Sequence, residues 1–422
     1  MKKKTTIAII NHSFQMEYYA RRWQLFAESH PDTEVYLLTP SKYSWYKNKA
    51  YTFGKSFDME GNDIDNKNYH IRTFKIEYVK YLGYKSKDFA TIFKDIDVDV
   101  IYMIGGHNTY ELAQVLNVRD SVVPSAKVIG FSMRGPALTL RIKRDKCNII
   151  KWVARRVLYF KQKQIQDYIY AHIDAFLCHY PDAVTCFKNE GYNGPIYMQT
   201  QVGVNKEWFH EDAAYRSEIR NKYGIADSTY VFGSATRFTR DKGVDEILRS
   251  LPADGDWKYL MMGSGNDEEL QRLKDIIKER NIEDKVIVTG FIDWLDMAQY
   301  WNAVDCAIHV PLTTPTWEET FSLAAIQPQI MKKPVIGDTS GSVPYQIGFD
   351  EMIVPEGDVS ALSQKMQWVL NNKDAARKVG EKMYIRTLNS FEVQHLNDLF
   401  YRTIVEDIIP GKYDSSKFDM AN

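Results

Sequence analysis

Cysteine is scarce in this chain, which has only four among its 422 residues. They stand at Cys147, Cys178, Cys186 and Cys306, so no pair has the Cys-x-x-Cys spacing of a zinc knuckle. Their scatter indicates no disulfide framework, and no cluster of metal-ligating side chains is evident. The sequence therefore predicts a reducing compartment and no metal cofactor.

Long apolar segments are missing as well. The first apolar run, Ile7–Ile10, stops at Asn11-His12, and no small-residue cleavage site follows it. No stretch approaches the ~18 consecutive apolar residues that a membrane-spanning helix needs. We therefore expect a cytoplasmic protein that is neither secreted by this route nor integral to a membrane.

The chain has almost no net charge, at −1. It therefore has no overall field that would hold nucleic acid, and a charged partner must bind a local patch. One patch covers residues 141–163, where nine Lys or Arg residues stand against the single acid Asp145, with Trp152 and Phe160 among the interleaved apolar residues. Such a basic amphipathic helix can lie on an anionic membrane surface. It can also pack its apolar stripe on its own domain, and both interpretations stay open.

What the chain does contain is enough apolar sequence for two domains. Hydrophobic cores stop growing near ~250–300 residues, so a chain of 422 residues is expected to divide and to form a cleft between its parts. In both halves, short β-like runs alternate with longer helical patterns, which predicts parallel sheets covered by helices. The expected strands are Ile7–Ile10, Glu34–Leu38, Val98–Met103, Lys127–Phe131 and Ala175–Cys178, then Tyr230–Ala235, Lys258–Met262, Lys285–Val288, Cys306–Val310 and Pro334–Gly337. The joint is expected near Val202–Asn205.

The segment Ser234–Asp245 carries basic groups directly after an expected strand and before a helix. Phosphate is favoured at such a place, because backbone N–H groups and the helix dipole also attract anions there. Arg237 can grip a diphosphate with its planar fork, and Lys242 can add a point charge. The alternative is a solvated basic loop.

A second segment, Pro311–Gln327, again joins a strand to a helix start. A helix that begins near Thr320 would direct its N–H groups at an anion or at sugar hydroxyls, and Glu319 could accept from hydroxyls. Gln327 would lie about two turns further along, near the same face. Glu319 could also be no more than an acid at a helix start.

Together these segments resemble the retaining family 4 glycosyltransferases (glycosyl transferases group 1), which have the GT-B fold of two Rossmann-like domains with an interdomain cleft. The matching motifs are Arg237, Lys242-Gly243, Gly263-Ser264-Gly265, Gly290-Phe291, Glu319-Thr320-Phe321-Ser322, Gln327 and Lys333-Pro334-Val335-Ile336. Their order and spacing follow the family pattern, and this joint match is much more specific than any single motif.

The resemblance implies a role for each matched residue. Arg237 and Lys242 would neutralise the leaving diphosphate of a nucleotide sugar without a metal, and Glu319 would hold the donor sugar. The remaining positions would bind the donor nucleotide or sugar: Gly263, Gly265, Gly290, Phe291, Thr320, Phe321, Ser322, Leu323 and Gln327. Among them, the backbone N–H groups of Phe321 and Ser322 would meet sugar or phosphate. Gln327 replaces the family's second Glu, so it would accept from the ribose without charge.

The amino-terminal half matches the family less well. After the first strand, Asn11–Glu17 lacks the family's Gly-rich turn, and Arg134 stands where many members have His before a Gly. Arg134 cannot act as a base, but it could stabilise an anionic acceptor or simply lie on a surface loop. His107, after Gly105-Gly106, and His12 are candidates for acceptor contact, although a lone His is often structural.

An Asp-x-Asp pattern at Asp95 and Asp97 resembles the metal motif of transferases with another fold, but it precedes an expected strand, where solvated acids are typical.

The resemblance implies an acceptor-binding domain over residues 1–205, a donor-binding domain over 206–388 and a terminal helix region over 389–422 that crosses back. By the same resemblance, the expected reaction is retaining, metal-independent transfer of a hexose-type sugar from a nucleotide-diphosphate sugar to a glycan or lipid-linked glycan. Two alternatives stay open. A nucleotide-sugar epimerase would use the same diphosphate grip, and a non-catalytic partner subunit would keep the fold with an eroded site.

Overall fold

The computed structural model describes residues 4–15, 17–43, 57–58, 63–132, 149–315 and 317–420. The chain divides into two compact units. The first unit comprises Met1–Val202 together with Leu396–Asn422, and the second comprises Gly203–His395.

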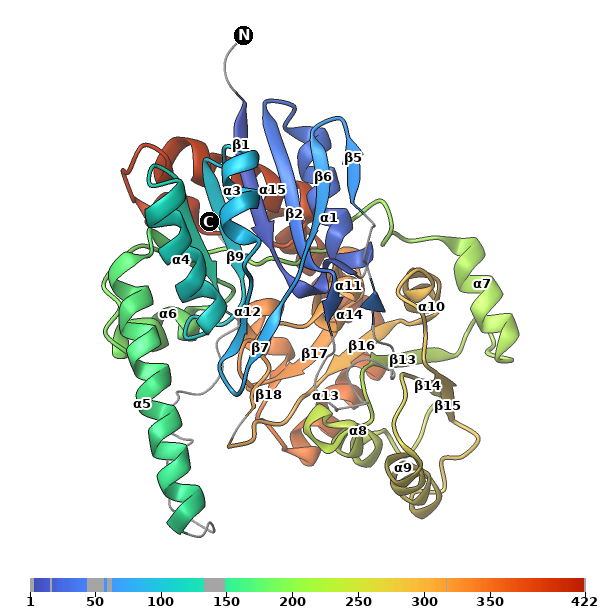
Figure 1. Ribbon diagram of the computed structural model, residues 1–422. Helices are drawn as coiled ribbons and strands as arrows, with labels where there is room; N and C mark the ends of the chain where they lie inside the picture. Colours follow the sequence, from blue (N-terminus) through green and yellow to red (C-terminus); the bar gives the residue numbers. More distant parts are fainter. Residues whose placement is uncertain are drawn as a thin grey trace. The chain divides into compact units, whose positions relative to one another are not determined.

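The first unit is built on an eight-stranded sheet in the order β12-β11-β10-β9-β1-β2-β6-β5 (Figure 1). All neighbours are parallel except β5 and β6. The sheet strands are β1 (Thr5–Ile10), β2 (Thr33–Pro40), β5 (Ile64–Asn66), β6 (Tyr69–Phe74), β9 (Val100–Ile104), β10 (Lys127–Phe131), β11 (Ala175–Cys178) and β12 (Ile196–Met198). Two small antiparallel pairs join β3 (Lys42–Tyr43) to β4 (Phe57–Asp58) and β7 (Glu77–Val79) to β8 (Gly83–Lys85). The helices are α1 (Glu17–Ser29), α3 (Phe89–Asp95), α4 (Tyr110–Val122), α5 (Ile149–His172) and α6 (Pro181–Asn189).

The central strands of this sheet are apolar along their whole length because helices cover both faces. Every residue of β9 and β11 is buried. The chain runs outward from β1 to β2 and then returns to place β9 on the other side of β1, so the strand order reverses between β1 and β9. Loops after these two strands meet where ligands usually bind in such sheets.

The carboxyl-terminal segment packs on the first unit. α15 (Val393–Arg402) leaves the second unit at residue 395, and a π-helical turn, Thr403–Ile408, follows it. The buried Arg22 holds this segment by donating from Nε to Asn397 Oδ1 at 3.1 Å, and it also donates to the carbonyl of Thr200 at 2.6 Å. The segment is therefore part of the first unit's fold.

The second unit has a parallel six-stranded sheet in the order β15-β14-β13-β16-β17-β18. Its strands are β13 (Tyr230–Ala235), β14 (Trp257–Met262), β15 (Val286–Gly290), β16 (Cys306–His309), β17 (Val335–Asp338) and β18 (Ile353–Val354). Its helices are α7 (Ala213–Lys222), α8 (Val244–Ser250), α9 (Asp267–Glu279), α10 (Met297–Ala303), α11 (Leu323–Ile330), α12 (Val343–Ile347), α13 (Val359–Asn371) and α14 (Lys373–Ser390). Here the strand order reverses between β13 and β16.

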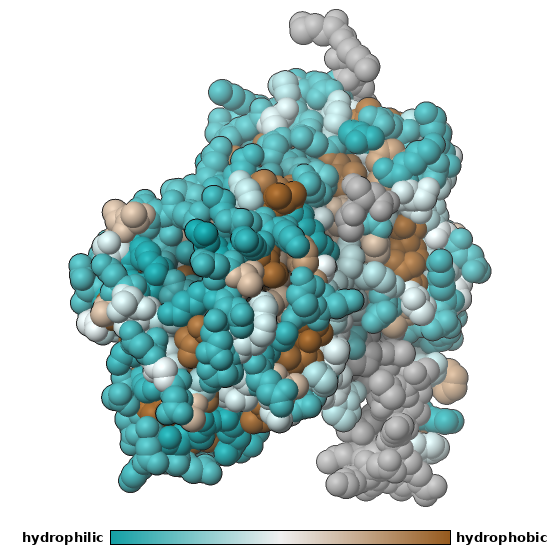
Figure 2. All heavy atoms as spheres, turned by 180° about the vertical axis from the view of Figure 1, so that it is seen from behind, coloured by the Kyte–Doolittle hydropathy of each residue, from teal (hydrophilic) through white to brown (hydrophobic). Residues whose placement is uncertain are grey.

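The predicted α/β class with two Rossmann-like sheets is confirmed. Each of the ten expected strands is present, with ends shifted by at most a few residues. On the face shown in Figure 2, hydrophilic residues predominate and hydrophobic residues form small separate groups. Within the described ranges, no helix combines the length and the apolar character needed to cross a membrane.

Candidate functional site

The loops that follow β13 and β16 pack against each other at the point where the second sheet reverses its strand order. The backbone N–H of Leu312 donates to the carbonyl of Asp241 at 2.9 Å. Gly243 has a φ of 68°, and a Cβ there would lie 1.8 Å from the carbonyl oxygen of Val310. Only glycine allows this approach, so Lys242-Gly243 is held directly against the end of β16.

This packing brings together Lys242 and Glu319, two residues predicted from separate segments. Lys242 Nζ lies 2.8 Å from Glu319 Oε2, and the two side chains are 12% and 9% exposed. The same ammonium lies 4.0 Å from the ring centroid of Trp317, within the range of a cation–π contact. Glu319 is therefore no solvated acid at a helix start, because it is buried and ion-paired.

His309, the last residue of β16, completes this cluster and was not predicted from the sequence. Its Nε2 lies 3.7 Å from Glu319 Oε2. Burial lowers the pKa of His309 to about 4, although the Glu319 carboxylate acts in the opposite direction. The imidazole is therefore neutral at neutral pH. The only sequence signal was a histidine inside an apolar strand.

A second buried acid, Asp338, ends the neighbouring strand β17. Burial raises the pKa of Asp338 to about 8, and the carboxylates of Glu356 and Glu319 act in the same direction. The backbone N–H of Ser340 donates to Oδ1 at 3.1 Å, whereas Oδ2 has no hydrogen-bond partner among the described residues. This carboxyl therefore carries a proton at neutral pH.

The loop with Arg237 is shaped by the glycines after β14. Gly263 has a φ of 145°, and a Cβ there would lie 1.8 Å from the carbonyl oxygen of Thr236. The N–H of Phe238 donates to the carbonyl of Ser264 at 2.9 Å. Gly263 thus allows close packing of the loop that carries the half-buried Arg237.

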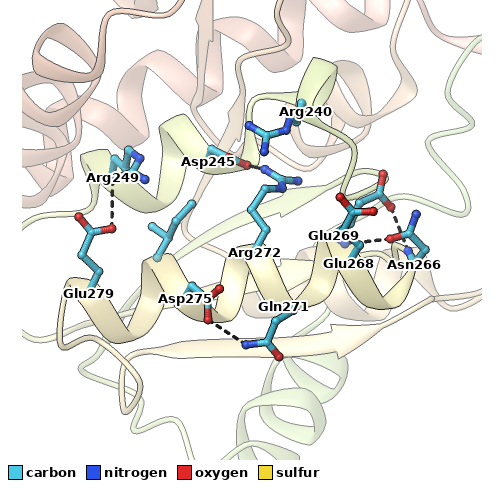
Figure 3. A pocket seen from close by; sticks show the side chains of 11 residues that line it. Arg240, Asp245, Arg249, Asn266, Glu268, Glu269, Gln271, Arg272, Asp275 and Glu279 are labelled. Carbon is cyan, nitrogen blue, oxygen red and sulfur yellow. Dashed lines mark hydrogen bonds and ion pairs between the residues drawn. The ribbon is translucent and has the colours of Figure 1, made fainter.

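Arg272 anchors the same loop from α9. A groove of about 710 Å³ lies between α8 and α9, and Figure 3 shows side chains of both charges along it. In this groove Arg272 pairs with Asp245 of α8 and donates from Nη2 to the carbonyl of Phe238 at 2.8 Å. We interpret the groove as charged helix packing that holds the loop of Arg237 and Lys242 in place.

The expected nucleobase position lies at the end of β15. Gly290 has a φ of 79°, and its carbonyl accepts from the N–H of Gly263 at 3.0 Å. Phe291, the next residue, is 57% exposed. An aromatic ring with this exposure can stack on a base, and this role stays a prediction.

The structure corrects the expected start of the helix in the segment Thr320–Leu323. α11 begins at Leu323 instead of near Thr320. The N–H of Ser322 is already used, because it donates to Oε1 of Gln346 at 2.9 Å while the Gln346 amide donates back to the Ser322 carbonyl at 2.9 Å. Gln346 is fully buried, so it fixes the start of α11. The expected contact of the Ser322 N–H with the donor sugar or phosphate stays a prediction, and it would replace this hydrogen bond.

Gln327 is buried, and its carbonyl oxygen already accepts a hydrogen bond. The indole Nε1 of Trp301 donates to Gln327 Oε1 at 3.1 Å. An amide oxygen has two lone pairs, so one further hydrogen bond remains available to it. The expected ribose contact thus depends on an oxygen that Trp301 holds in place.

In the first unit, His107 and His12 follow β9 and β1, at the point where that sheet reverses. His107 is buried, with Nδ1 2.9 Å from Ser132 Oγ and Nε2 3.6 Å from Glu190 Oε2. His12 stacks on Tyr43 at 4.5 Å between ring centroids, and burial lowers its pKa to about 4. Such contacts are typical of structural histidines. They therefore favour a structural role for both residues over contact with an acceptor.

Only some of the remaining residues predicted in the amino-terminal half lie within the described ranges. Arg134 and residues 141–148 of the basic segment lie outside the described residues. Asp95 ends α3 at the amino end of β9, where the Asp99 carboxylate accepts from the Thr6 N–H at 2.9 Å. Within the described parts of the chain, no group of three or more metal-ligating side chains is present.

The described part of the basic segment belongs to α5, whose amino-terminal half projects from the other elements of its unit (Figure 1). Val153, Val157 and Phe160 are 48%, 51% and 58% exposed. Their spacing places them on one face of the helix. This apolar face is therefore not packed on the domain.

Comparison with known families finds a match, which lies within the second unit. The family described as Glycosyl transferases group 1 matches residues 215–386. Among curated relatives, the Staphylococcus aureus capsular polysaccharide biosynthesis glycosyltransferase CapM is 24% identical over 206 residues, which are 46% of this chain and 50% of CapM. The Escherichia coli O-antigen biosynthesis glycosyltransferase WclY is 26% identical over 138 residues, 32% of this chain and 36% of WclY. The chain therefore matches only half or less of the length of these relatives.

Solved structures match the whole fold. Sucrose-phosphate synthase from Thermosynechococcus elongatus aligns with a TM-score of 0.68 and 15% identity, covering 96% of this chain and 100% of that chain. Anabaena HepE in complex with UDP and glucose aligns with a TM-score of 0.64 and 14% identity, with the same coverage. The lipopolysaccharide biosynthesis glycosyltransferase WaaG aligns with a TM-score of 0.63 and 12% identity, covering 95% and 100%. The fold is GT-B.

Proposed function

We propose, from a GT-B fold whose residues 215–386 match glycosyl transferases group 1, that this chain transfers a hexose-type sugar from a nucleotide-diphosphate sugar to a glycan or lipid-linked glycan. The transfer would retain the anomeric configuration. It would serve polysaccharide biosynthesis, the process in which CapM and WclY act. The observation that carries the proposal is the Lys242–Glu319 pair beside the loop of Arg237, at the strand reversal of the second unit.

In the proposed reaction, the bond between the sugar's anomeric carbon and the diphosphate oxygen breaks while a bond to the acceptor oxygen forms, and the proton of the acceptor hydroxyl passes to the departing diphosphate. Negative charge grows on the departing diphosphate, and Arg237 and Lys242 would stabilise it more strongly as it grows. Lys242 would exchange its contact with Glu319 for one with the diphosphate, and Glu319 would accept hydrogen bonds from the sugar hydroxyls. Two cations would thus do the work that a metal does in other transferases.

A calorimetric panel tests this proposal. UDP-, GDP-, ADP- and dTDP-sugars are titrated into the protein in EDTA, and binding of at least one is expected. That donor is then incubated with and without lipid-linked glycan acceptors. We expect its sugar to be transferred to an acceptor while EDTA is still present. An epimer formed from the donor alone would support the epimerase instead, and failure to bind any donor would support the non-catalytic subunit. Activity that needs added Mn²⁺ would contradict metal independence.

Gln327 offers a test of nucleotide binding. If its oxygen accepts from the ribose, Gln327→Glu should lower the nucleotide Kd, because a hydrogen bond to a charged group contributes ~1.5–3 kcal/mol against ~1 for a neutral one. Repulsion from the diphosphate will reduce this gain. Gln327→Ala should raise the Kd several-fold and destabilise the fold, since Trp301 loses its acceptor. Calorimetry with the nucleoside diphosphate measures both variants.

The control for Gln327 is Trp301→Phe, which removes the indole donor but leaves the amide. This substitution should lower the free energy of unfolding but have a smaller effect on the free energy of nucleotide binding. Unchanged Kd values for both Gln327 variants, with the fold intact, would show that this residue does not touch the ribose.

We also propose that α5 contacts an anionic membrane. Its exposed apolar face, Val153, Val157 and Phe160, lies beside Arg156 and Lys161, so one helix offers both apolar burial and charge attraction. Replacing the three apolar residues by serine should lower partitioning onto phosphatidylglycerol vesicles by about tenfold or more, measured by sedimentation. Ile385→Ser, at an equally exposed site of the second unit, should have no effect. Equal partitioning of the triple variant and the native protein would contradict the membrane contact.

A further inference from the structure

The two oxygens of the Glu319 carboxylate have different surroundings. Oε2 is 2.8 Å from Lys242 Nζ and 3.7 Å from His309 Nε2. Within the described part of the chain, no group hydrogen-bonds to Oε1. One oxygen is thus held by the Lys242 ammonium with His309 nearby, and the other remains available to a ligand.

The backbone of Glu319 is fixed independently of its carboxylate. Its carbonyl accepts from the N–H of Ser342 at 2.8 Å. A Cβ on Gly341, which has a φ of 46°, would lie 2.1 Å from that same carbonyl oxygen. The orientation of the carboxylate therefore depends on the side chains that hold Oε2.

His309 has a buried ring nitrogen without a hydrogen-bond partner. It is 6% exposed, and its Nε2 has no hydrogen-bond partner among the described residues. A neutral imidazole donates through one nitrogen only, and a buried polar group left unpaired is unfavourable. The separation of 3.7 Å from Glu319 Oε2 exceeds hydrogen-bond range by less than ~1 Å, so a small shift would close it.

We propose that His309 is the positioning residue that holds Glu319 when Lys242 turns to the diphosphate. As Lys242 leaves Oε2, the Nε2–H of His309 donates to the same oxygen, and Oε1 keeps its orientation toward the hydroxyls of the donor sugar. This inference rests on the proposed function and adds a residue to its sugar subsite. His309 should therefore affect the binding of the nucleotide sugar and not that of the nucleoside diphosphate, because the nucleoside diphosphate alone makes no contact with Glu319 in this arrangement.

The test uses the nucleotide sugar selected by the calorimetric panel and the matching nucleoside diphosphate. His309→Leu removes the donor at similar volume, and His309→Gln keeps an N–H. For His309→Leu, the Kd of the nucleotide sugar should rise about tenfold, the size expected for one hydrogen bond to a charged group, while the Kd of the nucleoside diphosphate stays within about twofold. His309→Gln should recover most of the loss, and kcat should follow the same order.

A double-substitution cycle separates positioning from packing. In a Glu319→Ala background, His309→Leu should have little further effect on sugar binding, because position 319 then has no side-chain oxygen for His309 to hold. The proposal would be overturned if His309→Leu raised the Kd of both ligands equally, or if its effect on sugar binding were undiminished in that background. It would also be overturned if His309→Gln did not recover sugar binding. If His309→Leu does not fold, His309→Met takes its place, with thermal unfolding as the check. Absence of binding of every nucleotide sugar by the native protein would overturn the proposed function itself, and the role of His309 with it.

Discussion

Replacement of Arg237 by alanine is expected to lower kcat/KM by about 30- to 1000-fold while the protein stays folded. This range corresponds to about 2–4 kcal/mol, the usual cost of removing one preorganised group that stabilises developing charge. Arg237 is half-buried in a loop that Arg272 and Gly263 hold by its backbone, so loss of the side chain leaves the loop anchored. Steady-state kinetics with the donor from the calorimetric panel measures the effect.

Lys242 needs a different substitution, because it also neutralises the buried Glu319. Lys242→Ala would leave that carboxylate without its cation, which costs about 3–5 kcal/mol of stability in buried pairs. Lys242→Gln keeps a donor to Glu319 while removing the positive charge. We expect the same loss of kcat/KM as for Arg237→Ala with a smaller loss of stability.

Arg240→Ala is the matched control for both variants. Arg240 is exposed two positions before Lys242, and it lines the groove between α8 and α9 (Figure 3). If charge in the loop acted only by attracting the donor from solution, all three substitutions would have similar effects that vanish at high salt. Near-normal turnover of Arg237→Ala or Lys242→Gln would show that the diphosphate site is wrongly assigned.

The strands could be predicted because parallel strands buried on both faces are continuous apolar runs. β6 (Tyr69–Phe74) was missed although its buried and half-buried residues alternate in part, and β18 is too short to produce a pattern. The chain's division at 202–203 and 395–396 lies near the expected boundaries at 205 and 388. The assignment of acceptor and donor roles to the two units stays a prediction.

Residues of the candidate site could be predicted only where they belong to a motif whose residue types and spacing indicate a chemical role. Lys242 and Glu319 were predicted from separate segments, and the sheet order that joins them is not contained in either segment. His309, Asp338 and Gln346 were missed because a single polar residue within or next to an apolar segment shows no sign of its partner. What each pairs with is decided by neighbouring strands and helices, far away in the sequence.

Asp338 gives a prediction about stability that needs no ligand. In the folded protein its carboxyl keeps a proton up to about pH 8, because burial raises its pKa from the ordinary value of 3.8. In the unfolded chain the group ionises near that ordinary value. Between about pH 4 and pH 8 the folded state therefore binds more protons than the unfolded state, so this residue's contribution to stability falls as pH rises.

Asparagine cannot ionise, and its carbonyl can still accept from the N–H of Ser340. Asp338→Asn should therefore leave the free energy of unfolding nearly unchanged at pH 4 and raise it by about 2–4 kcal/mol at pH 8, measured by urea unfolding. The exposed Asp254→Asn, in a loop of the same unit, should change stability by less than about 0.5 kcal/mol at either pH. An equal effect of Asp338→Asn at both pH values would mean that packing, and not the retained proton, determines its contribution. Destabilisation at pH 8 alone would mean that the native carboxyl is ionised there and paired with a cation.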